Sequence, residues 1–113
     1  MKTNVEKIDG VSVVTIDEEV LDSSNHEDFM DSMTPILEKE SQIIMDIGNL
    51  EMIDSSGLGS FAYCLRKSRD TGGKFVICSP SDNVREAFSL VHMERIIGIH
   101  ETRDDALTAL ATS

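Results

Sequence analysis

The sequence predicts an α/β domain: a mostly parallel, mixed β-sheet that opens with a hairpin and packs with about four α-helices. Two β-prone segments flank Asp9-Gly10, a pair that favours a tight antiparallel turn. Residues 43–47 and 74–78 are nearly continuously apolar, as in central strands covered on both faces. Helical patterns separate these strands, which favours parallel pairing through right-handed crossovers.

The length and composition allow one domain with an aliphatic core. A chain of 113 residues fits a single domain spanning 1–113 and is long enough to bury a core without disulfides. Hydrophobic residues make up 40% of the chain but aromatic residues only 4%, so the core must be built mainly from Ile, Val, Leu, Met and Ala.

The first half of the chain predicts a hairpin, a helix and a buried strand. The hairpin lies within Val5–Ile16, and Ser24 with Glu27 forms a capping-box pattern for the first helix. The apolar positions of this helix are Phe29, Met30, Met33 and Leu37. Pro35 lies inside the pattern, so we expect a kink or an early end there.

The second half continues the alternation. A helix from Leu58 ends at Gly72-Gly73, after a basic last turn. The next strand, 74–78, is followed by a helix with Val84, Ala87, Phe88 and Val91 on its apolar face. Residues 96–99 can form a last short strand, and Thr102 starts a C-terminal helix.

The charge of the chain excludes several functions. A formal net charge of −11 would repel the phosphates of nucleic acid and an anionic membrane surface. No apolar run approaches the ~20 residues that cross a bilayer.

The cysteines and histidines predict no disulfide and no metal site. Cys64 and Cys78 form no CxxC pair, which favours a reducing cytoplasm. The three histidines are scattered singly along the chain and do not have the spacing of metal ligands. We expect no cofactor.

The unusual segment is Gly48–Gly59, between the central strand and the second helix. Gly57 and Gly59 fall in the expected first turn, where each costs ~1 kcal/mol relative to Ala. Such glycines would leave the backbone open to a partner or a phosphate. On the residues alone, Ser55 or Ser56 is either a simple N-cap or a serine presented for modification.

The stretch Met52-Ile53-Asp54-Ser55-Ser56-Gly57-Leu58-Gly59 resembles the signature loop of the STAS family, in which anti-sigma-factor antagonists carry Asp-Ser-Ser/Thr-Gly-Leu-Gly after a central strand. Val20-Leu21-Asp22 and residues 90–97 extend the resemblance over nearly the whole chain. Pro35 departs from it, since the corresponding family helix usually runs unbroken.

The resemblance implies a phosphoswitch. An unphosphorylated antagonist binds a serine-kinase anti-sigma factor or a related switch kinase, phosphorylation of Ser55 releases it, and a PP2C-type phosphatase restores it. The implied partner-binding residues are Asp22, Asp54, Ser56, Gly57, Leu58 and Gly59.

Two alternative functions differ from this one in what they require of the sequence. A serine hydrolase is disfavoured because Ile53, not glycine, precedes Ser55 by two residues and no His-acid pair is evident. We therefore expect no enzymatic activity. The second alternative is a STAS subunit of another complex, in stress sensing, biofilm regulation or lipid transport, without direct control of a sigma factor.

Overall fold

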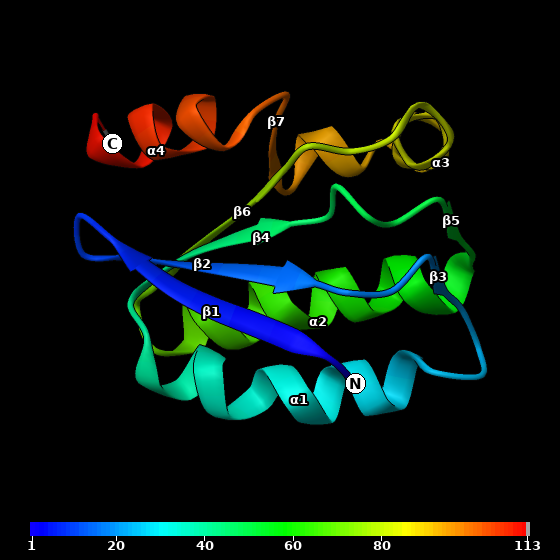
Figure 1. The fold of residues 1–113 in the computed structure, drawn as a ribbon, viewed down its shortest axis with the longest axis horizontal. Coiled ribbons are helices and arrows are strands. Elements are labelled where there is room, and N and C mark those ends of the chain that lie inside the picture. Colours follow the sequence, from blue (N-terminus) through cyan, green and yellow to red (C-terminus); the bar gives the residue numbers. More distant parts are fainter. Residues whose placement is uncertain (113) are drawn as a thin grey trace.

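The fold is a five-stranded mixed sheet with helices on both faces, seen in a computed structural model that describes residues 1–112 (Figure 1). The strand order is β1-β2-β4-β6-β7, and β3 and β5 form a separate two-stranded sheet. In chain order the elements are β1 (Thr3–Ile8), β2 (Val11–Ile16), β3 (Val20–Leu21), α1 (His26–Lys39), β4 (Gln42–Asp46), β5 (Met52–Ile53), α2 (Ser55–Asp70), β6 (Lys74–Cys78), α3 (Asp82–Leu90), the 3₁₀ helix η1 (Met93–Arg95), β7 (Gly98–His100) and α4 (Arg103–Ala111).

The predicted hairpin and parallel sheet are confirmed. Strands β1 and β2 pair antiparallel, and Asp9 and Gly10 form the turn with φ of 51° and 81°, the left-handed region that Gly and Asp tolerate. Strands β2, β4, β6 and β7 are all parallel. The mixed sheet with four α-helices is the α/β architecture that the sequence predicts.

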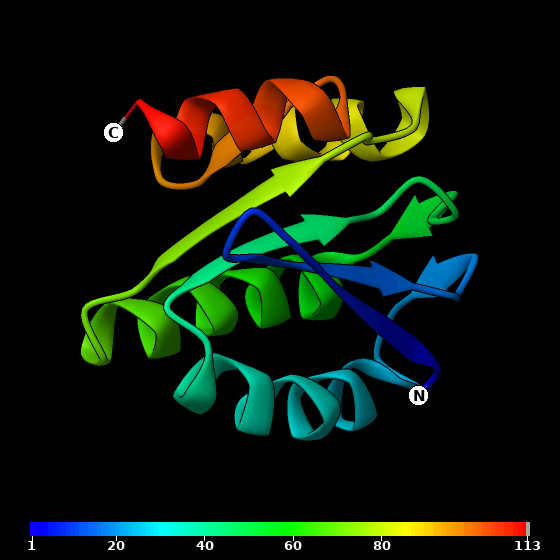
Figure 2. The same cartoon turned by 60° about the vertical axis from the view of Figure 1, so that its left-hand side comes forward.

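The sheet is covered unequally on its two faces. Helices α1 and α2 lie on one face and α4 on the other, with α3 beyond one end of the sheet (Figures 1 and 2). The larger core joins the first face to α3 and includes edge-to-face contacts of Phe61 with Phe29 and Phe88. The smaller core lies under α4 and includes Val13 and Ile44. The central strands are therefore buried on both faces, as their apolar sequence predicts.

The predicted start of helix α1 is wrong by one residue, and the capping box is absent. Asn25 occupies the N-cap position and its side chain does not cap the helix. Its Oδ1 accepts from the Asp22 amide at 2.9 Å and its Nδ2 donates to the Val20 carbonyl at 2.8 Å. Ser24 donates its hydroxyl to Asp22 instead. These side chains fold the turn before the helix rather than its first turn.

Pro35 does not end helix α1, which continues to Lys39. Buried Phe29, Met33 and Leu37 hold the helix against the sheet on both sides of the proline, which is itself exposed. The apolar packing offsets the hydrogen bond that proline cannot donate. The expectation of an early end is therefore wrong.

The chain after α3 also differs from the prediction. His92 adopts φ of 55°, and η1 follows before β7 starts at Gly98 rather than at residue 96. Met93 and Ile97 are buried in the core and Ile96 is exposed, so this segment is anchored by two side chains before it enters the sheet.

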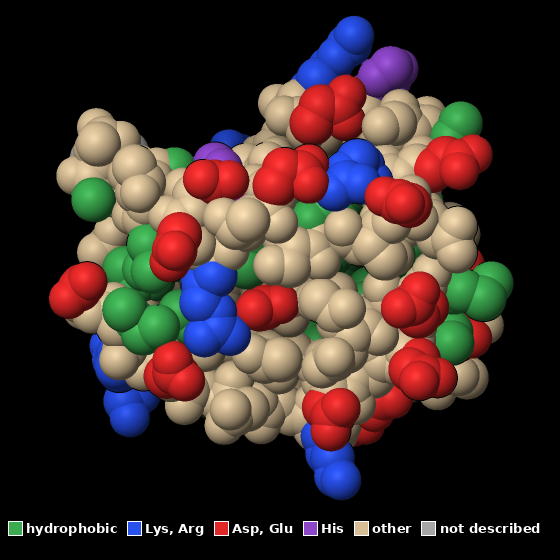
Figure 3. All heavy atoms as spheres, turned by 45° about the horizontal axis from the view of Figure 1, so that its top comes forward, with side chains coloured by type: hydrophobic (Ala, Val, Ile, Leu, Met, Phe, Trp, Pro, Cys, Tyr) green, Lys and Arg blue, Asp and Glu red, His purple; other side chains and the backbone are tan. Residues whose placement is uncertain are grey.

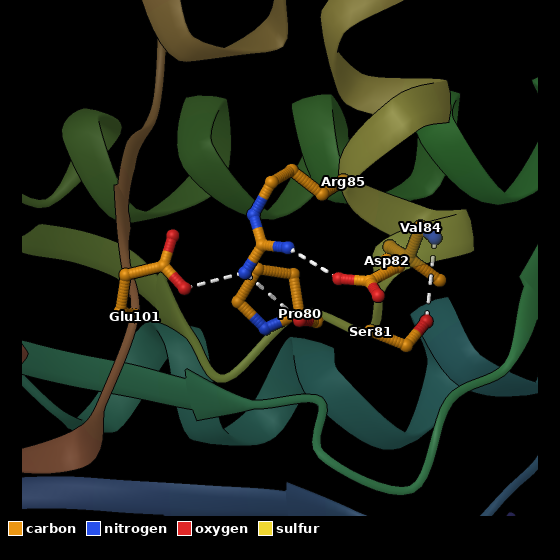
Figure 4. A network of polar contacts seen from close by, with 6 residues as sticks. All are labelled: Pro80, Ser81, Asp82, Val84, Arg85 and Glu101. Carbon is orange, nitrogen blue, oxygen red and sulfur yellow. Dashed lines mark hydrogen bonds and ion pairs between the residues drawn. The ribbon is translucent and has the colours of Figure 1, made fainter.

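The start of α3 is tied to the start of α4 by one arginine (Figure 4). Ser81 caps α3 by accepting from the Val84 amide at 3.3 Å. Arg85 donates to Asp82 and Glu101, and so links the β6–α3 and β7–α4 connections. Among the described residues, no helix is both long and apolar enough to cross a membrane.

Candidate functional site

The two short strands that the sequence did not predict build the site. Strands β3 and β5 pair in parallel, with Val20 opposite Met52 and Leu21 opposite Ile53. This pairing draws the β3–α1 turn against the β5–α2 junction (Figure 1). The Asp54 amide then donates to the Leu21 carbonyl at 3.2 Å. Two segments some 30 residues apart thus form one surface.

Asp54 is the N-cap of α2 and also the link between the two segments. Its Oδ1 accepts from the Gly57 amide at 3.0 Å, and its Oδ2 accepts from the Ser23 amide at 3.2 Å. A carboxylate at this position complements the positive end of the helix dipole. The interpretation of Ser55 or Ser56 as the N-cap is therefore wrong, and α2 starts at Ser55 rather than at Leu58.

Ser55 is the first helical residue of α2 and is exposed. Within residues 1–112 its hydroxyl makes no hydrogen bond, and neither do the amides of Ser55 and Ser56. The first amides of a helix point outward along its axis, where they can bind an anion or a partner's acceptor. The site thus presents a free hydroxyl beside two free amide donors.

Gly57 and Gly59 differ in what surrounds them. Gly57 is buried, and a Cβ there would lie 2.6 Å from the Leu21 carbonyl oxygen and 2.6 Å from Ile53 Cγ1. Gly59 is exposed, and a Cβ there would meet nothing within 4 Å. Gly57 is therefore glycine because α2 packs tightly on β3 and β5, which corrects the idea that it leaves the backbone uncovered. Only Gly59 opens the helix surface.

Asp22 lies in the turn that faces Asp54. The Ser24 hydroxyl and the Ser24 amide both donate to its carboxylate, at 2.6 and 2.9 Å, and these bonds hold the pKa of Asp22 below its ordinary value. Asp22 is therefore an anion at neutral pH and its orientation is fixed. Of the predicted partner-binding residues, the structure brings Asp22, Asp54 and Ser56 to one end of α2.

An open acidic depression of about 640 Å³ adjoins this end. Its acidic lining is Asp17, Glu18, Glu19, Asp22 and Glu51. Next to it Met52 is 61% exposed, opposite Val20 in the β3–β5 pair. The run Asp17-Glu18-Glu19 was not predicted as part of a site, although three successive acidic residues after a strand are visible in the sequence. Figure 3 shows that acidic side chains are also spread over the face carrying α3 and α4.

The other candidate reactive groups take no part in the site. Cys64 and Cys78 are buried, and burial raises the pKa of their thiols to about 12 and about 11. No group of His, Cys, Asp and Glu side chains within residues 1–112 could hold a metal ion. The groups that remain at this end of α2 are the Ser55 hydroxyl and the carboxylates of Asp22 and Asp54.

The fold is a small α/β domain in which an exposed serine starts the helix after β5. The STAS domain family model matches residues 2–106. The chain belongs to the STAS domain family.

Individual relatives are similar over most of their length. An assigned anti-sigma factor antagonist, BtrV of Bordetella bronchiseptica, is 28% identical over 114 residues, covering 100% of this chain and 97% of BtrV. The crystal structure of an anti-sigma factor antagonist from Mycobacterium paratuberculosis is 26% identical, with a TM-score of 0.84 and coverage of 96% and 92%.

The fold is also that of the Bacillus anti-sigma factor antagonist SpoIIAA, at 19% identity. Its unphosphorylated form aligns with a TM-score of 0.76, covering 99% of this chain and 98% of SpoIIAA, and its phosphorylated form with 0.69, covering 96% and 99%. The antagonists that the chain resembles act by binding rather than by catalysis, in agreement with the prediction that it is not an enzyme.

Proposed function

We propose that the chain is a partner-switching antagonist whose docking to a serine-kinase anti-sigma factor, or to a related switch kinase, is controlled by phosphorylation of Ser55. The observation that carries the proposal is the exposed, unbonded hydroxyl of Ser55 at the first position of α2. It is supported by the similarity to antagonists, one of which has been solved in phosphorylated and unphosphorylated forms.

The surroundings of Ser55 explain how a phosphate could be carried without unfolding the domain. Phosphorylation would add a charge of about −1.5 to −2. The free amides of Ser55 and Ser56 and the positive end of the helix dipole stabilise part of it. Asp54 opposes it but is held by the Gly57 and Ser23 amides. The domain thus tolerates the modification while its surface changes.

The same charge accounts for release from the kinase. The kinase brings the γ-phosphate of a nucleoside triphosphate to the Ser55 hydroxyl, which loses its proton to a base of the kinase as the new phosphate ester forms. The bond to the nucleoside diphosphate breaks in the same step. Phosphoserine and diphosphate are then both anionic within one interface, and Asp54 and Asp22 add to the repulsion. Hydrolysis by a PP2C-type phosphatase restores the binding form.

The remaining proposed contacts follow from exposure. Asp22, Ser56, Leu58 and Gly59 reach the surface around Ser55, with Met52 as an apolar contact beside them. Gly57 contributes indirectly, by allowing α2 to start where it does. The proposal includes a cytoplasmic location, because a kinase of this type finds its nucleotide there.

The test combines phosphate mapping with binding. The chain is purified from cells with its partner, the partner is identified, and the complex is incubated with ATP. Ser55→Ala should bind the partner but take up no phosphate, whereas Ser55→Asp should bind less tightly. Ser56→Ala is the matched control and should still be phosphorylated at Ser55. Phosphate on another residue, with Ser55 unmodified, would refute the assignment.

The identity of the partner decides between the two functions that the sequence left open. A kinase-like ATPase found with a sigma factor supports antagonism. A membrane or multimeric assembly without such a kinase would instead make the chain a structural subunit of that complex.

A further inference from the structure

A second recessed surface lies at the opposite end of α2 from Ser55. It is a groove of about 290 Å³, formed where the end of α2, the start of β6, the start of β7 and the end of α4 meet. Its apolar lining is Leu65, Phe75, Val76, Ile96, Ala109 and Leu110. Arg69 of this groove lies 14 residues from Ser55, about 20 Å along the helix axis. The two surfaces are therefore separate.

The groove exists because β7 is shorter than β6. Their pairing begins only at Val76 opposite Gly98, so β7 does not run beside the first two residues of β6. Strand β7 is also the last strand of the sheet. The Lys74 amide donates to the Ser41 carbonyl on the β4 side, so the groove is a hollow in front of β7 rather than an open strand edge.

The rim of the groove is basic in a strongly acidic chain. Arg69 and Lys74 line it, and Arg66 and Arg69 line an adjoining hollow that shares Leu65 and Ile96. Asp70 is the one acidic residue among the residues lining these two hollows. Neither Arg66 nor Arg69 forms an ion pair with another described residue, whereas Arg85 and Arg103 do.

A simpler account of the basic residues is incomplete. Lys67 and Arg69 lie in the last turn of α2, where cations stabilise the negative end of the helix dipole. Stabilisation of the helix dipole explains the basic residues but not the apolar floor of the groove. It also does not explain why Ile96, at the edge of the groove, is 50% exposed. Ile96 follows η1 directly, while its buried neighbour Ile97 already anchors the chain.

We propose that this groove is a second docking site, for an acidic segment of a partner protein that carries apolar side chains. Charge complementarity selects an acidic occupant, because Arg66 and Arg69 are free to pair with carboxylates. The apolar floor selects a segment that also carries apolar side chains, because their contact removes both apolar surfaces from water. The site does not depend on the function proposed for Ser55, and both surfaces can be occupied together.

The test uses a peptide of defined chemistry, Ac-Glu-Ile-Asp-Val-Glu-Leu-NH₂, titrated into the ¹⁵N-labelled chain. We expect saturable chemical-shift changes at Leu65, Arg69, Phe75 and Gly98, and the same affinity for Ser55→Ala. Two control peptides replace either the acids by lysine or the apolar residues by serine, and neither should bind.

Two variants test the groove directly. Arg69→Glu should weaken binding about tenfold or more, equivalent to at least ~1.4 kcal/mol, and Ile96→Ser should weaken it through the apolar floor. Lys2→Glu, which makes the same change in net charge away from the groove, is the control and should bind like the parent. Both altered groove residues are exposed, so the variants should fold, which their NMR spectra will verify.

Four results would overturn the proposal. They are the absence of saturable binding, equal binding of the serine or lysine peptide, shifts centred on Ser55 rather than on the groove, and self-association of the chain that Arg69→Glu abolishes. The last result would identify the occupant as a second copy of this chain.

Discussion

Replacing Gly57 by alanine tests how the site is held together. The new Cβ would lie 2.6 Å from the Leu21 carbonyl oxygen, a backbone atom that also accepts the Asp54 amide hydrogen bond. The atom cannot rotate away as a side chain would, so α2 must shift from β3. Overpacking of this kind costs about 3 kcal/mol, at the upper end of the usual range.

The helix itself gains from the same substitution. Alanine is favoured over glycine within a helix by ~1 kcal/mol. The net expectation for Gly57→Ala is a loss of about 2 kcal/mol in the free energy of unfolding, or roughly 8 °C in Tm for a chain of this size. Strain should spread to the Leu21–Asp54 contact and so disturb the Ser55 surface.

Gly59 provides the matched control two residues along the same helix. Nothing lies within 4 Å of a Cβ at this position, so Gly59→Ala should gain ~1 kcal/mol, roughly 4 °C in Tm. Thermal and urea unfolding followed by circular dichroism measure both variants. If Gly57→Ala proves as stable as Gly59→Ala, the close packing of α2 on β3 is not what requires glycine at position 57.

Three further expectations follow from the site and the core. Asp54→Ala removes the N-cap and should lower the free energy of unfolding by about 1 kcal/mol. Asp54→Asn can still accept from the Gly57 amide and should lower it less. Equal losses of the two variants in urea unfolding would argue against capping by Asp54. Because the pKa of Asp22 is lowered in the folded protein, its bonds from Ser24 should persist above the ordinary aspartate value of about 3.9 and be lost only as pH falls through the lower folded value. The Ser24 amide shift should report that midpoint by NMR, and a midpoint at or above 3.9 would contradict it. Cys64 and Cys78, buried with raised pKa values, should resist iodoacetamide at pH 8 and react after denaturation in urea, and rapid labelling of the native chain would contradict their burial.

The alternation of strands and helices and the location of the candidate site could both be predicted from the sequence alone. The Asp9-Gly10 turn and the apolar strands around residues 45 and 76 carry their signals locally, in turn chemistry and in side-chain pattern. The glycine-rich start of α2 was likewise visible as an anomaly in a helix. Such signals need no knowledge of distant contacts.

The structural roles of the individual residues in that site depend on how the chain folds in three dimensions. Strands β3 and β5 have two residues each, too few for any periodic signal, and exist because they pair with each other. Once they pair, Asp54 rather than a serine caps α2, and Gly57 is glycine because the Leu21 carbonyl leaves no room for a Cβ. The Asp54 cap itself is local, because Asp54 and Gly57 are three residues apart. The Asp54 bonds to Leu21 and Ser23 and the close approach of Leu21 to Gly57 join segments some 30 positions apart, which the local pattern of a single sequence does not contain. The same arrangement leaves the Ser55 hydroxyl exposed and without a hydrogen bond to any of residues 1–112, because its neighbour Asp54 supplies the cap.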